Sequence, residues 1–233
     1  MVMLAPNNPK PLVTTSDLEW LDVEPVPEII KDKFAAYEPT TSDAMRAVAA
    51  WVKGFLDCSH RHLGRTGKVC PFVRGSMDKE VMYLTAIEGS TTPAGAKEAV
   101  AKFVDVFTAL QPIDRTEGKL VTILILFPAV APEQAPSVID ALQAELKPQF
   151  VDQGYMIGQF HPNCPEPGVR NPAFRPLRAP IPMLVIRNMI PEDLEFLHDD
   201  RCCWENYCKR IPATQVPMRL REKYTNPGWA AAK

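Results

Sequence analysis

The segment "KLVTILILFP", residues 119–128, constrains the fold of this chain more than any other stretch. It is nearly continuously apolar and rich in β-branched residues, whereas a strand with one wet face alternates apolar and polar residues. The pattern therefore predicts a central strand that is buried on both faces. With 233 residues, the chain is long enough to place a layer of structure on each face.

The remaining elements are predicted from periodicity, capping residues and prolines. Apolar residues at helical spacing predict a first core helix at 41–59, behind a capping Thr41 or Ser42. Further helices are predicted at 93–112, 136–154 (with a break or kink at Pro148) and 191–200, and further strands at 80–89, 155–160 and 182–189. This order predicts an α+β fold, with a four-stranded mixed or antiparallel sheet, helices packed on it, and helical extensions at the N- and C-termini.

The domain organisation is expected to be simple, because neither an internal repeat nor a clear linker divides the chain. We predict a single domain over residues 1–233. Within it, residues 1–40 form an N-terminal arm with short helices, 41–200 form the α+β core, and 201–233 form a C-terminal helical extension.

Composition and charge exclude several classes of function. The net charge of −2, without a block of Lys or Arg, argues against a nucleic-acid partner. No apolar run approaches the roughly 18 residues of a membrane span, so no membrane partner is expected. The N-terminus "MVMLAPNNPKP" lacks the pattern of a secretion signal, and a cytoplasmic location is the expectation.

The six cysteines show no disulfide framework, so we expect free thiols in a reducing compartment. Three of them lie in the predicted C-terminal extension: Cys202, Cys203 and Cys208. Adjacent cysteines on a helix point apart, so these three are interpreted as packing thiols.

The first candidate site is the polar segment "CSHRHLGRTGKVCPF", residues 58–72. Its possible zinc ligands are Cys58, His60, His62 and Cys70. The ligand types suit zinc, but their spacing differs from that of common zinc motifs. Two alternatives are a helix end with cationic histidines near the helix dipole, and a pocket wall in which "GRTGK" offers amides and two cations to a carboxylate or phosphate.

The second candidate site is the stretch 161–182, which contains seven prolines and the arginines Arg170, Arg175 and Arg178. Pro162 restricts the backbone of His161 and so fixes the direction of its side chain. An imidazole and arginines beside an apolar cleft suit haem, which needs an axial nitrogen and partners for two propionates. In the alternative, the prolines cover a sheet edge, His161 is structural and the arginines are solvated.

Four segments carry a resemblance to a known family: "LGRTGKVCPF" (63–72), "LVTILILFP" (120–128), "FHP…NPAFRPLRAPIPMLVIRNM" (160–189) and "EDLEFL" (192–197). In these the chain resembles an uncharacterised bacterial domain family found near biosynthetic genes. It is more distantly similar to YqcI/YcgG-type haem-dependent N-oxygenases. The resemblance covers about residues 45–200, and its most specific part is the segment after His161.

The resemblance implies a haem b site. His161 would be the axial ligand, flanked by Phe160, and Arg178 or Arg187 would meet the propionates. The implied wall residues of this pocket are Cys70 and Phe72.

The same hypothesis assigns roles to the first candidate site. The carboxylate of a substrate would be held by Arg65, Lys68 and Arg74, and His60 or His62 would act as catalytic proton donors. The chain would then be a haem-binding protein and a haem-dependent oxygenase of specialised metabolism, acting on a small, nitrogen-containing, amino-acid-like substrate. An external electron donor and a homodimer are further options. The alternatives are a cofactor-free ligand-binding or accessory protein, and a small zinc protein built on Cys58, His60, His62 and Cys70.

Overall fold

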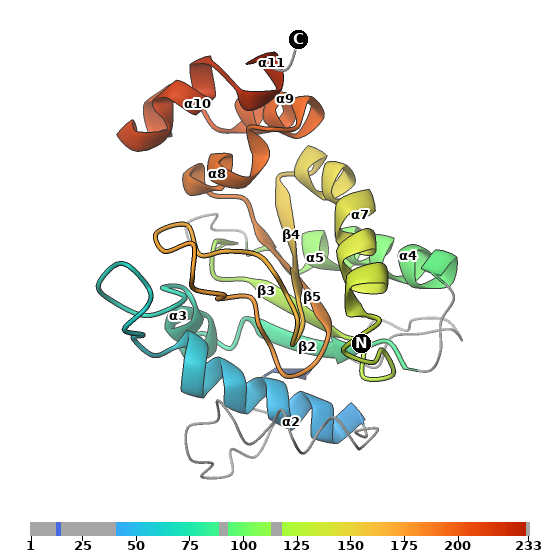
Figure 1. Ribbon diagram of the computed structural model, residues 1–233. Helices are drawn as coiled ribbons and strands as arrows, with labels where there is room; N and C mark the ends of the chain where they lie inside the picture. Colours follow the sequence, from blue (N-terminus) through green and yellow to red (C-terminus); the bar gives the residue numbers. More distant parts are fainter. Residues whose placement is uncertain (1–12, 15–40, 89–92, 113–117, 232–233) are drawn as a thin grey trace.

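The computed structural model describes residues 13–14, 41–88, 93–112 and 118–231 (Figure 1). The arm and short helices predicted for residues 1–40 therefore lie outside the described residues, except for the two-residue strand β1, Val13–Thr14.

One mixed sheet forms the centre of the molecule. Its main strands are β2 (Met82–Ala86), β3 (Thr122–Leu126), β4 (Tyr155–Phe160) and β5 (Met183–Asn188). The strand order is β1-β2-β3-β5-β4, with β2 and β3 parallel and β5 antiparallel to both of its neighbours. The predicted α+β fold with four main strands is confirmed, and β1 pairs with β2 as a short edge strand.

Helices cover both faces of this sheet (Figure 1). On one face lie α2 (Thr41–Trp51), the π-helical turn η2 (Val52–Leu56) and α3 (Val73–Asp78). On the other lie α4 (Pro93–Ala101), α5 (Phe103–Ala109), the π-helical turn η3 (Pro136–Asp140) and α7 (Ala141–Asp152). None of the helices in the described ranges is long and apolar enough to cross a membrane.

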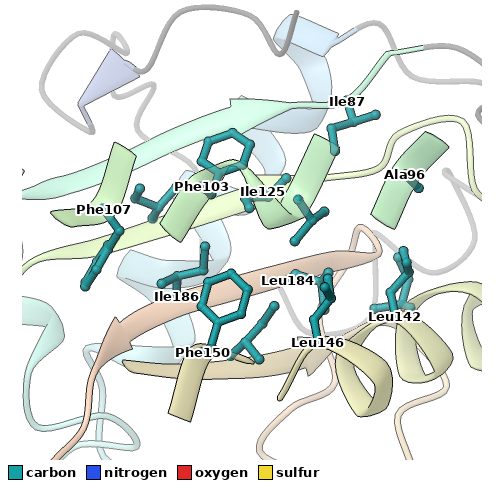
Figure 2. Packing of buried hydrophobic residues seen from close by; sticks show 14 of the residues in the cluster. Ile87, Ala96, Phe103, Phe107, Ile125, Leu142, Leu146, Phe150, Leu184 and Ile186 are labelled. Atoms are coloured by element: carbon teal, nitrogen blue, oxygen red, sulfur yellow. The ribbon is translucent and has the colours of Figure 1, made fainter. Parts of the chain in front are cut away.

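Strand β3 is buried on both faces, as its sequence predicts. Ile123 and Ile125 belong to the core beneath α4, α5 and α7, where Figure 2 shows Phe107 and Phe150 packed over the sheet. The alternate residues of β3, Leu124 and Leu126, belong to the core beneath α2. Because successive side chains of a strand point to opposite faces, an unbroken apolar run serves two cores at once.

The observed helices contain interruptions and π turns that the sequence pattern does not predict. The helix predicted at 41–59 changes at Val52 into a π turn, in which the amide of Asp57 donates to the carbonyl of Val52 at 3.0 Å. The helix predicted at 93–112 is interrupted at Lys102, and that at 136–154 begins as a π turn. Pro148 does not break its helix, because α7 continues to Asp152, and a kink there stays a prediction. A π turn has no distinct signature in a 3.6-residue periodicity, so the sequence pattern could not locate these changes.

The C-terminal segment packs as a third layer against the ends of α7 and β4. Its helices are η4 (Pro191–Asp193), α8 (Leu194–Leu197), α9 (Arg201–Arg210), η5 (Ala213–Gln215), η6 (Met218–Leu220), α10 (Arg221–Thr225) and α11 (Gly228–Ala231). The fully buried Tyr207 donates its hydroxyl hydrogen to the Pro191 carbonyl at 2.7 Å. Cys203 and Cys208 pack in this cluster as predicted, whereas Cys202 is exposed.

The two-sided burial of β3 makes a stability prediction. Leu126→Ala removes a side chain that is 0% exposed, so we expect the free energy of unfolding to fall by about 2–5 kcal/mol. Val169→Ala, at a residue that is 49% exposed, is the matched control and should change it by less than about 0.5 kcal/mol. Urea denaturation measures both; equal effects of the two variants would contradict the described packing of β3.

Candidate ligand-binding site

The connection between β4 and β5 is longer than the sheet requires. The two strands are antiparallel neighbours whose ends, Phe160 and Met183, are paired directly. A turn of about two residues can join such a pair, and loops longer than about 12–15 residues are uncommon and usually functional. The chain instead inserts residues 161–182, which we call the proline loop.

A second long segment, residues 57–72, follows η2 and is called the hairpin loop. Ser59 and Lys68 form an antiparallel bridge. The amide of Val69 donates to the Cys58 carbonyl at 2.8 Å, and the amide of Cys70 donates to the Leu56 carbonyl at 2.9 Å. These bonds fold the segment back on itself and leave residues 63–67 at its tip.

The two loops dock on each other and lie side by side beyond α3 (Figure 1). The Asn171 side chain donates to the His62 carbonyl at 2.8 Å. Gly64 has a φ of +75°, and a Cβ at this position would lie 2.9 Å from the Cβ of Arg170. The two loops thus form one unit, which we call the loop clasp, and only glycine fits at position 64.

An aromatic ladder joins the loop clasp to the core. His60 stacks on Phe174, with ring centroids 4.7 Å apart and an interplanar angle of 22°. Phe55 of η2 lies 6.1 Å from Phe174, and Trp51 of α2 lies 5.9 Å from both Phe55 and Phe160. The π turn places Phe55 in this ladder, so the end of α2 positions the hairpin loop relative to β4.

His161 anchors the proline loop from within the protein. Its side chain is 0% exposed, and Nε2 lies 3.0 Å from Oδ1 of Asp140, the last residue of η3. Its amide donates to the Leu177 carbonyl at 3.3 Å. Its own carbonyl accepts from the amides of Cys164 and Ala179, at 3.1 and 3.3 Å. These bonds tie both ends of the loop to one residue.

This environment does not fit His161 as an axial haem ligand. An axial imidazole must face a space that admits the porphyrin, but this ring is fully enclosed. Its Nε2 is committed to Asp140, and Nδ1 is buried without a hydrogen-bond partner among the described residues. Haem b therefore remains a prediction of the sequence resemblance.

The other implied haem residues are dispersed. Arg187 pairs with Asp193 through two hydrogen bonds, of 2.7 and 2.5 Å. Burial alone would lower the pKa of Arg187, but the Asp193 carboxylate outweighs burial and raises it. Arg178 is directed to the Cys164 carbonyl at 3.4 Å. The remaining members, Phe160 and Cys70, pack in the core beneath α2, and Phe72 precedes α3.

The zinc alternative is not assembled in the structure. Across the described ranges, no group of three or more His, Cys, Asp and Glu side chains is placed to hold a metal ion. The exposed Cys58 directs Sγ at the Lys53 carbonyl, 3.5 Å away. The four predicted ligands share one loop, but their side chains do not converge.

Asp57 gathers two of the three cations predicted to bind a substrate carboxylate. Its side chain is 2% exposed, and its two oxygens pair with Lys68 and Arg74, each at 2.5 Å. The cations are 38% and 55% exposed, so each keeps a face toward solvent. Arg65, the third, donates to two carbonyls of its own loop, at 3.0 and 3.1 Å. All three cations therefore shape the hairpin loop. Because Asp57 carries one negative charge and contacts both Lys68 and Arg74, one positive charge remains.

His60 is held as a neutral hydrogen-bond donor. The His62 amide donates to Nδ1 of His60 at 3.1 Å, so the neutral ring carries its hydrogen on Nε2. Burial, followed by the charges of His62 and Arg61, lowers the pKa of His60. His60 and His62 do lie side by side, with ring centroids 5.5 Å apart. In this tautomer His60 can donate to a ligand through Nε2, but it cannot ligate a metal through that atom.

The loop clasp carries a concentrated positive charge. The cations of the two loops, together with the adjoining Arg74 of α3, are Arg61, Arg65, Lys68, Arg74, Arg170, Arg175 and Arg178. The same segments contain two carboxylates, Asp57 and Glu166. A surplus of five positive charges thus occurs in a chain whose net charge is −2.

Cys164 lies close to His161 and Asp140, a combination that could suggest a nucleophilic triad. The thiol is fully buried, and burial, the largest cause, raises its pKa to about 11. A nucleophilic cysteine needs a thiolate near neutral pH. Cys164 is therefore a packing residue, and all six cysteines are free thiols, as predicted.

Sequence reasoning missed Asp57, Asp140 and Phe174, which hold the two loops in place. Each acts through a partner distant in sequence or through a π turn, so no local motif marks them. The sequence offers one signal for them, which is that Asp57 and Asp140 are acidic residues within otherwise apolar helical patterns.

A comparison with family models matches residues 45–223 to a family described as a domain of unknown function, DUF6875. The match spans most of the chain and includes both loops of the clasp, and the chain belongs to this family. No curated protein and no solved structure shows a match to the chain.

The docking of the loops predicts the effect of a single methyl group. Gly64→Ala should push the two loops apart, because the added Cβ meets backbone and Cβ atoms of Arg170 at a positive φ. We expect a loss of about 1–3 kcal/mol in stability, with faster amide hydrogen exchange in residues 168–174. Gly158→Ala is the control, since its Cβ would meet only Phe160 at an ordinary 3.5 Å. Unchanged exchange in Gly64→Ala would contradict the docked arrangement.

Proposed function

We propose that this chain is a cofactor-free protein that binds a small anionic ligand at the loop clasp. The observation that supports this most is the surplus of five positive charges on two docked loops and the adjoining Arg74 of α3, in a chain whose net charge is −2. One of these loops exceeds what the β4–β5 connection needs. Like charges brought together without a ligand repel one another, so their grouping favours a ligand that neutralises them.

The main alternative is that these cations only brace the hairpin loop around Asp57. One cation would neutralise that carboxylate, whereas Lys68 and Arg74 both contact it and keep exposed faces. Arg170 makes no hydrogen bond or ion pair with the described part of the chain. Bracing therefore accounts for part of the charge, and a surplus remains for a ligand.

The size of the charged region favours a small molecule over a nucleic acid. A nucleic-acid surface needs a row of cations that matches successive phosphates. Here the cations of the clasp lie on short loop segments, and the second excess of cations, in residues 201–233, lies in the separate C-terminal segment. The neutral Nε2–H of His60, stacked on Phe174, adds a directional donor beside the cations, which suits a ligand of a few polar atoms.

A titration of the full chain with citrate, glutamate and inorganic phosphate tests the proposal. We expect saturable changes in amide NMR shifts confined to residues 57–74 and 166–178 for at least one of these anions. Arg170→Gln should weaken binding by at least about tenfold, because hydrogen bonds to charged groups contribute about 1.5–3 kcal/mol. Arg201→Gln, at an exposed arginine of α9 paired with Glu205, is the control and should leave the affinity unchanged.

Two results would contradict the proposal. One is the absence of any saturable shift in the clasp. The other is uptake of one equivalent of haem with a sharp Soret band that His161→Ala abolishes, which would instead support the hypothesis of a haem-dependent oxygenase. A purified wild-type protein that stays colourless and takes up no haem is the result our proposal expects.

A further inference from the structure

The tip of the hairpin loop exposes a run of backbone donors. Within the described residues, the amides of residues 64–67 donate no hydrogen bond. Gly64 and Gly67 both have positive φ values, +75° and +92°. Successive amides next to left-handed residues form concave sites for anions. The Thr66 hydroxyl, in the same run, is also without a partner in the described part of the chain.

The tip is held in shape without its ligand. The Arg65 guanidinium donates to the carbonyls of Thr66 and Val69, at 3.0 and 3.1 Å. It therefore occupies the Thr66 carbonyl, one of the acceptors within this run of residues. At the base of the tip, the Leu63 amide donates to the His60 carbonyl at 3.0 Å. A preformed loop loses little conformational entropy on binding.

The proline loop brings an arginine to the tip. The backbone and Cβ of Arg170 lie against Gly64, whose missing side chain allows this approach. The Arg170 guanidinium makes no hydrogen bond or ion pair with any residue that the structure describes. Lys68 follows the tip directly and shares Asp57 with Arg74, so its charge is only partly neutralised.

We infer that the tip binds the phosphoryl group of a small phosphate ester, with the amides of 64–67 and the Arg170 guanidinium as its donors. The inference rests on the proposed function and names its ligand. A carboxylate offers two oxygens and one charge, whereas a phosphate ester offers three terminal oxygens and about −1.5 to −2 charges at pH 7. Four adjacent amides, a hydroxyl and a forked guanidinium match the larger set of acceptors.

The tip differs from the phosphate loop of nucleotide hydrolases. "GRTGK" has two residues between its glycines, whereas that motif has four and opens a helix after a strand. Here the segment is the end of a hairpin that leads through Val69 and Cys70 to α3. Binding without hydrolysis is therefore the activity inferred for this tip.

Phenyl phosphate and benzoate, which share a ring and differ in the anionic group, provide the test. In the wild-type chain, phenyl phosphate and inorganic phosphate should shift the amide resonances of residues 64–67, and phenyl phosphate should bind at least about tenfold more tightly than benzoate. Arg170→Gln should reduce the affinity for phenyl phosphate by a similar factor, Arg170→Lys by less, and Arg201→Gln not at all.

The outcomes separate this inference from the proposed function. If benzoate or citrate binds in the clasp as tightly as phenyl phosphate, the phosphoryl assignment is overturned and the anion-binding function stands. If phenyl phosphate binds without shifting residues 64–67, the assignment of the tip is overturned. If none of these anions shifts the clasp, both proposals fail together.

Discussion

The hydrogen bonds of His161 hold the proline loop in place, and the other contacts of the loop clasp depend on that loop. Strands β4 and β5 pair directly, so a connection as long as the proline loop is not needed to join them. A loop of this length would sample many conformations, but the side chain of His161 is bound to Asp140 and its backbone to Leu177, Cys164 and Ala179. The loop can therefore present Phe174 and Arg170 to the hairpin loop in a fixed position.

Much of the fold could be predicted because it rests on local patterns. The unbroken apolar run of β3 indicated burial on two faces, and Ile125 and Leu126 do face different cores. The site was harder to predict, because its contacts join residues far apart in sequence. His161 was identified, but its partner Asp140 sits on a π turn that periodicity cannot reveal. The meeting of Gly64 with Arg170 likewise depends on the packing of two whole loops.

Charge and shape act together in the loop clasp. Asp57 directly follows the π turn η2 and Asp140 is the last residue of η3, and these carboxylates hold the hairpin loop and the proline loop respectively. Each carboxylate thus has a structural role. The remaining positive charge of the loop clasp lies around the tip of the hairpin loop. Membership of the DUF6875 family adds no activity to this picture, so the function rests on the geometry of the clasp.

The central claim is that an anion binds between the tip of the hairpin loop and Arg170. The most direct measurement is a crystal structure of the full chain soaked with selenate, a tetrahedral dianion that anomalous scattering locates without ambiguity. The account predicts a selenium peak within hydrogen-bond distance of the amides of 64–67 and of the Arg170 guanidinium. Ordered selenate elsewhere on the protein, with a tip that is empty and clear of neighbouring molecules, would contradict it.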